Sequence, residues 1–262
     1  MTFFFRYFLP FSYFKSTRLF NLNYAAYHIL LEGVPVLLLT LIYSNYSVNA
    51  LSTALLSYLA FICIYEIGYI TNDFYSEKFE EDPRGRSKDK NVALLIIWSL
   101  IIVKTIFFLL FSYLLGSLNN FIWWTFHIML MMTFIFHNIR MKEYRLSTFF
   151  SLSVFRFMAP LVLCLPGEIF LFLSSVVMLN YSLFRVITYG VNKNLIEISN
   201  RDTTKFKFVY YINCLPLNVL LSVSYRSFLP IIFCLYYIFL WIICSKMRIS
   251  STQHEMVRFS SV

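Results

Sequence analysis

The sequence predicts an all-α membrane protein, a bundle of about eight transmembrane helices. Three observations lead to this prediction. Hydrophobic residues make up 59% of the 262 residues and charged residues only 13%, a balance outside that of ordinary soluble domains. The apolar residues gather in segments of about 20 residues, the length that an α-helix needs to cross a bilayer. Polar connections rich in Lys and Arg separate many of these segments.

The apolar segments define the expected elements in chain order. An aromatic and basic stretch, residues 1–20, comes first; it is broken by Pro10, and we expect it to lie in the membrane interface. Only the short sequence Pro-Gly-Glu separates the fifth apolar segment from the sixth. We expect the whole chain, residues 1–262, to form a single transmembrane domain. The expected spans are residues 25–43, 51–71, 92–115, 120–138, 147–166, 168–188, 207–225 and 228–245.

The distribution of charge predicts the orientation of these spans. Lys and Arg outnumber Asp and Glu by 22 to 13, which gives a net charge of +9. Outside the spans, nearly all of them lie near the chain ends or after an even-numbered span, and the other connections carry only Arg226. The positive-inside rule then places both termini and the long connections in the cytoplasm. We therefore interpret the excess as topological, expect no nucleic-acid partner, and expect the plasma (inner) membrane of a bacterium as the location.

The strongest candidate site lies in the stretch from Glu66 to Arg86. This stretch leaves the second apolar segment and places five acidic residues within ten positions. With 3.6 residues per turn, Asp73, Glu77 and Glu80 share a helical face. Like charges at this spacing repel one another, and a hard divalent cation such as Mg²⁺ would turn that repulsion into coordination. The pattern predicts a metal site, with a solvated connection that only sets topology as the alternative.

Two charges inside the expected spans have more than one interpretation. Glu66 could extend the acidic face inwards, or it could pair with Lys104 or Arg156 for structural reasons. A charge inside a span is costly and usually faces the bundle interior. Arg156 lies deep in the fifth span, where it could bind an anionic head group.

Basic and polar residues in the expected cytoplasmic connections are candidates for binding phosphate. Arginine suits this role because its planar guanidinium binds phosphate through two hydrogen bonds at once. The alternative is ordinary cytoplasmic connections with topological charge. The candidate substrate-binding residues are Arg84, Arg86, His137, Asn138, Arg140, Arg145, Arg156, Tyr189, Asn192 and Lys193.

The stretch after the second span resembles the first signature of the UbiA-type intramembrane prenyltransferases. That signature, NDxxDxxxD, lies at the cytoplasmic end of the second span and precedes a Pro- and Arg-rich stretch. Asn72 and Asp73 match its start, and Glu80 stands at its third acidic position. Ser76 replaces the middle aspartate, with Glu77 one position farther on.

The rest of the chain follows the same family in part. The sequence HNIRMKEYR after the fourth span is similar to the family's basic, aromatic loop, and the order of the three long connections fits over residues 20–245. The family's second signature, a DxxxD-type motif after the sixth span, is absent; Asn192 and Asn194 occupy that region. The family usually has nine spans.

The resemblance implies a membrane transferase that acts on a polyprenyl lipid. It implies prenyl transfer from an allylic polyprenyl diphosphate to a small acceptor, with Mg²⁺-assisted loss of pyrophosphate. By position, it implies catalytic roles for Asn72, Asp73, Glu77 and Glu80, with Mg²⁺ held by Asp73, Glu77 and Glu80.

Two other functions remain open from the sequence. The first is phosphoribosyl transfer to a polyprenyl phosphate, within the same superfamily. The second is a non-catalytic lipid-binding or transport protein of the same fold. In each case we expect a polyprenyl (di)phosphate lipid as partner, together with a small acceptor or donor if the protein is an enzyme.

Overall fold

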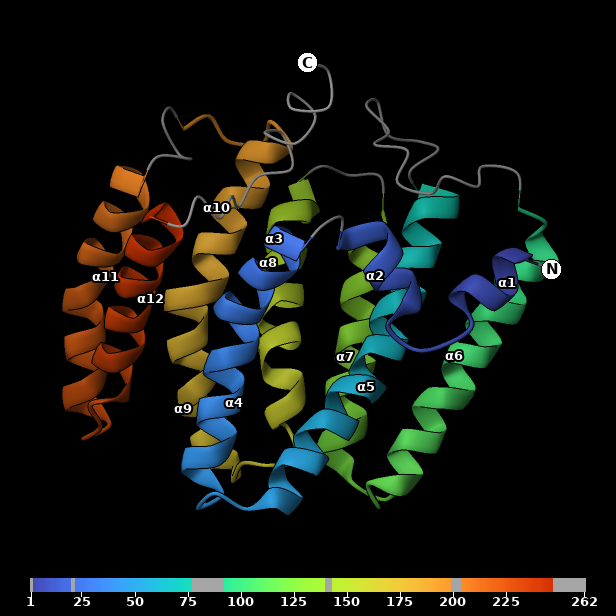
Figure 1. The fold of residues 1–262 in the computed structure, drawn as a ribbon, viewed down its shortest axis with the longest axis horizontal. Coiled ribbons are helices and arrows are strands. Elements are labelled where there is room, and N and C mark those ends of the chain that lie inside the picture. Colours follow the sequence, from blue (N-terminus) through green and yellow to red (C-terminus); the bar gives the residue numbers. More distant parts are fainter. Residues whose placement is uncertain (1, 20–21, 77–91, 140–142, 199–203, 247–262) are drawn as a thin grey trace. The chain divides into compact units, whose positions relative to one another are not determined.

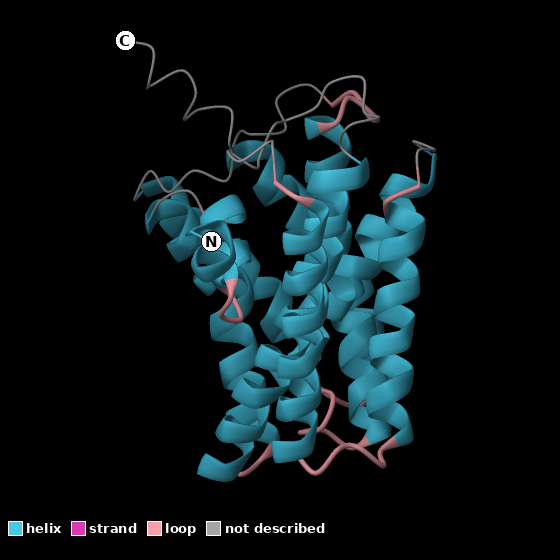
Figure 2. Cartoon of the chain, turned by 90° about the vertical axis from the view of Figure 1, so that its right-hand side faces the viewer, coloured by secondary structure: helices cyan, strands magenta, loops and turns pink. Residues whose placement is uncertain are grey.

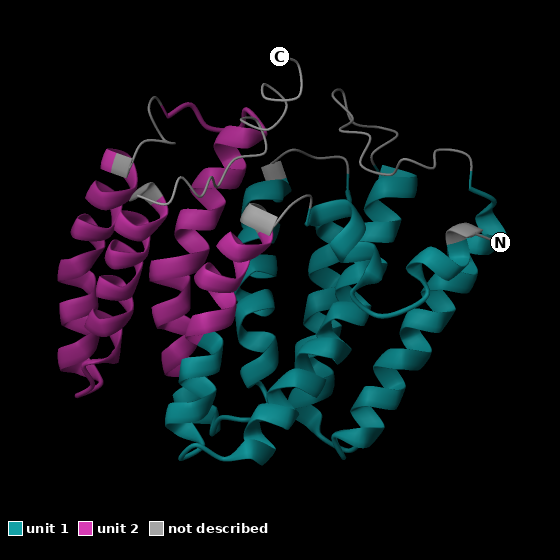
Figure 3. Cartoon of the chain, in the orientation of Figure 1, with its two compact units in different colours: residues 1–20, 36–170 teal, residues 21–35, 171–262 magenta. Residues whose placement is uncertain are grey.

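Helices form all the regular structure in the part of the chain that the computed structural model describes, which is residues 2–19, 22–76, 92–139, 143–198 and 204–246. Figure 2 shows these helices and the loops that join them. The predicted all-α class is therefore confirmed. The chain divides into two compact units, Met1–Phe20 with Val36–Phe170 and Asn21–Pro35 with Leu171–Val262 (Figure 3). We call them unit 1 and unit 2; the single domain 1–262 stays a prediction.

Unit 1 is built around the long helix α5, which packs against α6 and α7 (Figure 1). Two short helices, α1 and α2, precede it in the chain, and they contact α6 and α5 respectively. The elements are α1 (Thr2–Tyr7), α2 (Ser12–Arg18), α4 (Val34–Tyr43, from Val36 on), α5 (Val48–Thr71), the π-helical turn η2 (Asn72–Ser76), α6 (Leu94–Leu114), α7 (Phe121–His137), α8 (Glu143–Met158) and the 3₁₀ turn η4 (Ala159–Leu161).

Unit 2 is held together by α11 and α12, which pack side by side, and by two π-helical turns that contact α12. Each turn interrupts a longer helix. The elements are α3 (Leu22–His28), the turn η1 (Ile29–Gly33), α9 (Gly167–Val177, from Leu171 on), the turn η5 (Met178–Ser182), α10 (Leu183–Asn192), α11 (Thr204–Ser224) and α12 (Leu229–Lys246).

Five helices in the described ranges are long and apolar enough to cross a membrane: Ala25–Tyr43, Val48–Ser76, Leu94–Leu114, Gly167–Asn192 and Lys205–Ser224. Two further apolar helices, Phe121–His137 and Leu229–Cys244, are shorter. The chain is therefore a multi-pass integral membrane protein, as predicted, and the count of eight spans stays a prediction.

The expected fifth span, residues 147–166, does not form one continuous α-helix. It falls on α8, which ends at Met158 and is followed by the 3₁₀ turn. Pro160 lies in that turn, and a proline has no backbone N–H and would collide with the carbonyl one turn earlier. The proline explains why α8 stops there.

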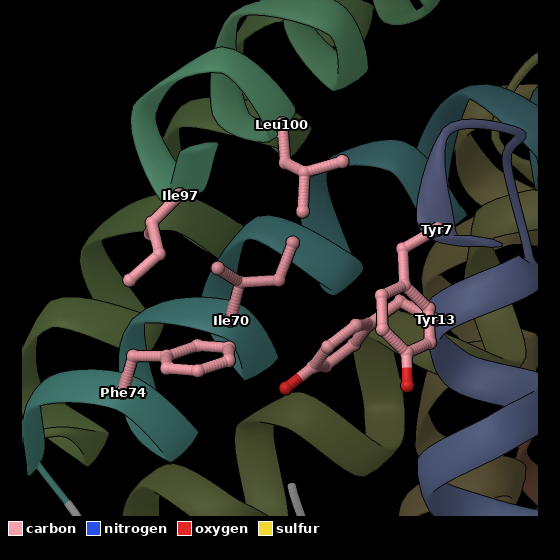
Figure 4. Packing of buried hydrophobic residues seen from close by; sticks show 6 residues of the cluster. All are labelled: Tyr7, Tyr13, Ile70, Phe74, Ile97 and Leu100. Carbon is pink, nitrogen blue, oxygen red and sulfur yellow. The ribbon is translucent and has the colours of Figure 1, made fainter. Parts of the chain in front are cut away.

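The N-terminal segment packs into unit 1, and its place in the membrane interface stays a prediction. Tyr7 and Tyr13 are buried in a cluster with Ile70 and Phe74 from the end of α5 and η2 and with two residues of α6. Figure 4 shows the two tyrosine rings beside these aliphatic and aromatic side chains. Burial of this apolar surface holds α1 and α2 against α5 and α6.

Candidate functional site

Asp73 lies at the start of η2, just after α5, and its carboxylate is enclosed by hydrogen-bond donors. Oδ1 is 2.7 Å from Nη2 of Arg18 and accepts a second bond, 3.2 Å long, from the Asn72 amide. Oδ2 accepts a bond of 2.9 Å from the Tyr13 hydroxyl. Asp73 is only 7% exposed. The residue predicted to bind a metal is thus bonded to a guanidinium from the N-terminal segment.

Burial and charge keep both of these N-terminal donors protonated. Burial raises the pKa of the Tyr13 hydroxyl, and the neighbouring Asp73 carboxylate raises it further. Burial opposes the charge of Arg18, but its attraction to Asp73 outweighs that effect and raises the pKa of the guanidinium. Both shifts in pKa favour the protonated forms of Tyr13 and Arg18.

Glu66, two turns before Asp73 on α5, forms a second buried ion pair. Its Oε2 lies 2.6 Å from Nζ of Lys104 on α6, and both residues are completely buried. Nζ also donates a bond of 2.6 Å to the backbone carbonyl of Leu9. Lys104, one of the two partners expected for Glu66, is therefore the one with which it pairs.

The same carboxylate binds the first turn of α2. The backbone N–H groups of Phe14 and Phe11 donate to Glu66 at 2.8 and 3.2 Å. The first N–H groups of a helix have no partner inside the helix, so an acceptor placed there stabilises it. Glu66 supplies that acceptor from another helix.

Glu66 and Asp73 therefore bind opposite ends of α2. They stand seven positions apart on α5 and η2, and α2 itself has seven residues; at 1.5 Å per helical residue each stretch covers about 10 Å. Glu66 meets the first turn of α2, and Asp73 meets Arg18, its last residue. The helix α2 lies along the end of α5 in the same direction, fixed at both ends by carboxylates.

Aromatic rings connect two buried arginines in the same unit. The guanidinium carbon of Arg18 lies 4.2 Å from the centre of the Tyr69 ring, which stacks on Phe14 with centroids 6.0 Å apart. The guanidinium carbon of Arg156, on α8, lies 5.0 Å from the Phe14 ring. Arg18 and Arg156 are only 7% and 8% exposed. Guanidinium groups are attracted to ring faces, especially where water is excluded.

Two other predicted residues link α7 to this region. Nδ2 of Asn138, just after α7, donates to the Gly68 carbonyl at 3.3 Å and to the Thr71 hydroxyl at 3.2 Å. His137 lies 2.8 Å from the Thr148 hydroxyl and so joins α7 to α8. The structure thus brings Asn138 to the last turn of α5, which precedes Asn72 and Asp73 in the chain.

Four of the other predicted residues lie in the part of the chain that the structure describes. Arg145 is half-buried on α8. Tyr189 and Asn192, at the end of α10, and Lys193, which follows it, are half-buried and belong to unit 2. Outside the described residues lie Glu77, Glu80, Arg84, Arg86 and Arg140.

Asp73 does not fit Mg²⁺ in this arrangement. Mg²⁺ binds carboxylate oxygens at about 2.1 Å in a nearly octahedral shell, and Arg18 and Tyr13 already occupy both oxygens of Asp73. Within the described ranges, no group of three or more His, Cys, Asp or Glu side chains could hold a metal ion. A metal on Asp73 would first have to displace Arg18, while Glu77 and Glu80 stay predictions.

Sequence reasoning did not single out Tyr13 or Arg18 as site residues. Arg18 pairs with a carboxylate 55 positions away, and no local pattern indicates such a contact. Lys104 did give a signal, because a lysine inside a long apolar segment needs a partner.

No protein-family model, curated protein or solved structure shows significant similarity to this chain. The functional interpretation therefore depends on the residues of the site.

Proposed function

We propose that this protein is a membrane transferase of the UbiA type that acts on a polyprenyl diphosphate. In the proposed reaction, the bond between the allylic carbon and the diphosphate oxygen breaks and pyrophosphate leaves with the electron pair. The prenyl group forms a bond to a small acceptor, which loses a proton. The connections around the end of α5 face the cytoplasm in this proposal.

One observation carries the proposal: two guanidinium groups and a carboxylate are buried in one unit of an apolar helical bundle. Arg18 and Asp73 form an ion pair, and Arg156 joins them through Phe14 and Tyr69. Charged groups inside a membrane bundle are costly and usually serve function. Binding an anionic lipid head group is a function that would use two arginines.

The residues of the cluster have distinct parts in this proposal. Arg18 and Arg156 offset the negative charge that grows on the departing pyrophosphate, as fixed cations do in a site that excludes water. The rings of Phe14 and Tyr69 hold the two guanidinium groups in place through their faces. Asp73 orients Arg18. Because Arg18 occupies Asp73, the proposal assigns no step to Mg²⁺.

The test is product formation by purified protein with two substrate sets. One set pairs a polyprenyl diphosphate with a mixture of aromatic acceptors, and the other pairs phosphoribosyl diphosphate with a polyprenyl phosphate. Pyrophosphate release gives the rate, and mass spectrometry of the lipid fraction identifies the product. We expect turnover with the first set, whereas turnover with the second set alone would replace prenyl transfer by phosphoribosyl transfer.

Arg156→Gln is the informative variant, with Arg6→Gln as its control. Loss of a fixed charge that stabilises the departing group lowers turnover by about a hundredfold. Arg6 is an exposed residue of α1 outside the cluster, so its variant should match the wild type. Equal rates for the two variants would exclude the assigned role of Arg156.

A non-catalytic lipid-binding protein is the second candidate. The ion pair between Arg18 and Asp73 favours this candidate. The resemblance to a metal-dependent enzyme depends on the Asp73 carboxylate, and Arg18 already binds that carboxylate. No turnover with either substrate set, together with saturable binding of polyprenyl phosphate that Arg156→Gln weakens, would establish this second function.

A further inference from the structure

At the candidate site, the positive charge beside Asp73 comes from a side chain of the protein, the guanidinium of Arg18. Asp73 stands where the sequence pattern calls for a metal ligand, and its Oδ1 lies 2.7 Å from the Arg18 guanidinium. The Tyr13 hydroxyl occupies the other oxygen at 2.9 Å. A carboxylate with both oxygens engaged, one by a positive charge, has little affinity left for a second cation.

Several independent contacts fix Arg18 in this position. Nη1 is 3.3 Å from the Thr17 carbonyl, and the guanidinium carbon lies 4.2 Å from the Tyr69 ring. The helix that carries Arg18 is itself bound at its first turn by Glu66. The cation is therefore held by the fold of α2 along α5 and does not depend on one flexible side chain.

One N–H group of the Arg18 guanidinium is not bonded to Asp73. Its Nε is buried and, among the described residues, has no hydrogen-bond partner. In a metal-dependent site the cation links a carboxylate to substrate phosphate. A guanidinium bonded to Asp73 through Nη2 can make the same link, with Nε–H donating to a phosphate oxygen.

We infer that the guanidinium of Arg18 replaces a divalent metal ion at this site. It binds Asp73 at the position that such an ion would otherwise occupy. The wild-type protein then binds no divalent cation through Asp73, and removal of the guanidinium creates such a site. The inference builds on the proposed function in taking Asp73 as part of the substrate site. Its test measures metal binding alone and needs no turnover.

The experiment is a titration of the purified full-length protein in detergent with Mn²⁺, followed by electron paramagnetic resonance. The proteins compared are wild type, Asp73→Asn, Arg18→Gln, Arg18→Lys and the double variant Arg18→Gln/Asp73→Asn. We expect wild type and Asp73→Asn to bind Mn²⁺ identically. Arg18→Gln should gain one additional site, which the double variant lacks, and Arg18→Lys should behave as wild type because it keeps the positive charge.

The dissociation constant gives the size of the effect. Arg18→Gln should bind one more Mn²⁺ per chain than wild type, at concentrations at least about a hundredfold below those at which wild type shows any binding that depends on Asp73. Binding by wild type that Asp73→Asn abolishes would overturn the inference. A folded Arg18→Gln protein that gains no site would overturn it as well.

A second measurement covers the case in which Arg18→Gln does not fold. Thermal unfolding of wild type and Asp73→Asn is then followed with excess Mg²⁺ and with chelator. The same response to Mg²⁺ in both proteins supports the inference, and stabilisation of wild type alone contradicts it. Neither result depends on turnover, so a failure of the transferase proposal would be recognised separately.

Discussion

The two units of the chain join their helices with different kinds of buried polar contact. In unit 1, two of the contacts of α5 and η2 are ion pairs, Glu66 with Lys104 and Asp73 with Arg18. In unit 2 the amides of Asn180 and Asn218 donate to each other at 2.8 and 3.0 Å, with both side chains completely buried. These contacts of unit 1 thus join charged groups and this contact of unit 2 joins neutral amides, although unit 2 also places Nζ of Lys207 4.4 Å from the centre of the Trp241 ring.

Tyrosines of unit 2 add a second kind of neutral contact. The hydroxyls of the adjacent residues Tyr210 and Tyr211 donate to the consecutive carbonyls of Leu179 and Asn180 in η5, both at 3.0 Å. A second tyrosine pair does the same for η1. There Tyr236 donates to Leu30, and Tyr237 donates to Leu31 at 3.1 Å.

These tyrosine pairs have a common physical reason. A π-helical turn changes the regular hydrogen-bond pattern of the helix, and a backbone carbonyl left without a donor in an apolar environment is costly. In unit 2 a tyrosine hydroxyl from a neighbouring helix donates to each of four carbonyls in these turns. Unit 2 therefore solves a structural problem with groups that carry no charge.

The difference indicates where to look for function. Burying two charges costs more than their attraction returns in many proteins, and apolar replacements are often as stable. Neutral pairs avoid most of that cost. The ion pairs around α5 are thus poorly explained by stability alone, which supports unit 1 as the location of the proposed site.

The largest expected effect comes from breaking the Glu66–Lys104 pair. Lys104→Met leaves a buried carboxylate without its cation and should lower the free energy of unfolding by about 3 to 5 kcal/mol. Denaturant unfolding in detergent micelles, followed by circular dichroism, measures it. The double variant Glu66→Gln/Lys104→Met should recover most of the loss, and Lys15→Met, at an exposed position of α2, should change little. A double variant as unstable as Lys104→Met would show that the pair is not the cause.

A smaller effect is expected from the neutral amide pair of unit 2. Asn218→Leu leaves the Asn180 amide short of a partner, which should cost about 1 to 3 kcal/mol. The same unfolding measurement applies. Replacing both asparagines by leucine removes both polar groups and should be nearly neutral. A loss for Asn218→Leu as large as that for Lys104→Met would remove the energetic distinction between the two units.

The smallest effect is expected from the tyrosines that bind the π-helical turns. Tyr211→Phe and Tyr237→Phe should each cost about 1 kcal/mol, because each removes one hydrogen bond to a buried carbonyl and leaves the ring in place. Tyr113→Phe is the control, since Tyr113 is exposed on α6. Thermal unfolding of the three variants side by side makes the comparison. If all three unfold at the same temperature, the tyrosine contacts do not stabilise the turns.

The sequence predicted the helices well where composition is uniform. The expected span 120–138 corresponds to α7 at Phe121–His137, and the second span is followed by a change of helix type at Asn72. It did less well at 147–166, because Pro160 interrupts an otherwise apolar run. The three π-helical turns among the described residues were not predicted, since their extra residue is stabilised by contacts with other helices and leaves no local pattern.

By itself, the sequence determined that the chain is helical and membrane-spanning, because hydropathy and spacing act locally along the chain. It also identified Asp73 as the residue at the centre of the candidate site. The tertiary structure decided which cation lies there. Any of the 22 Lys and Arg residues could attract a carboxylate, because electrostatic attraction has no sequence signature. Only the folding of α2 along α5, fixed by Glu66 at one end, selects Arg18 for Asp73.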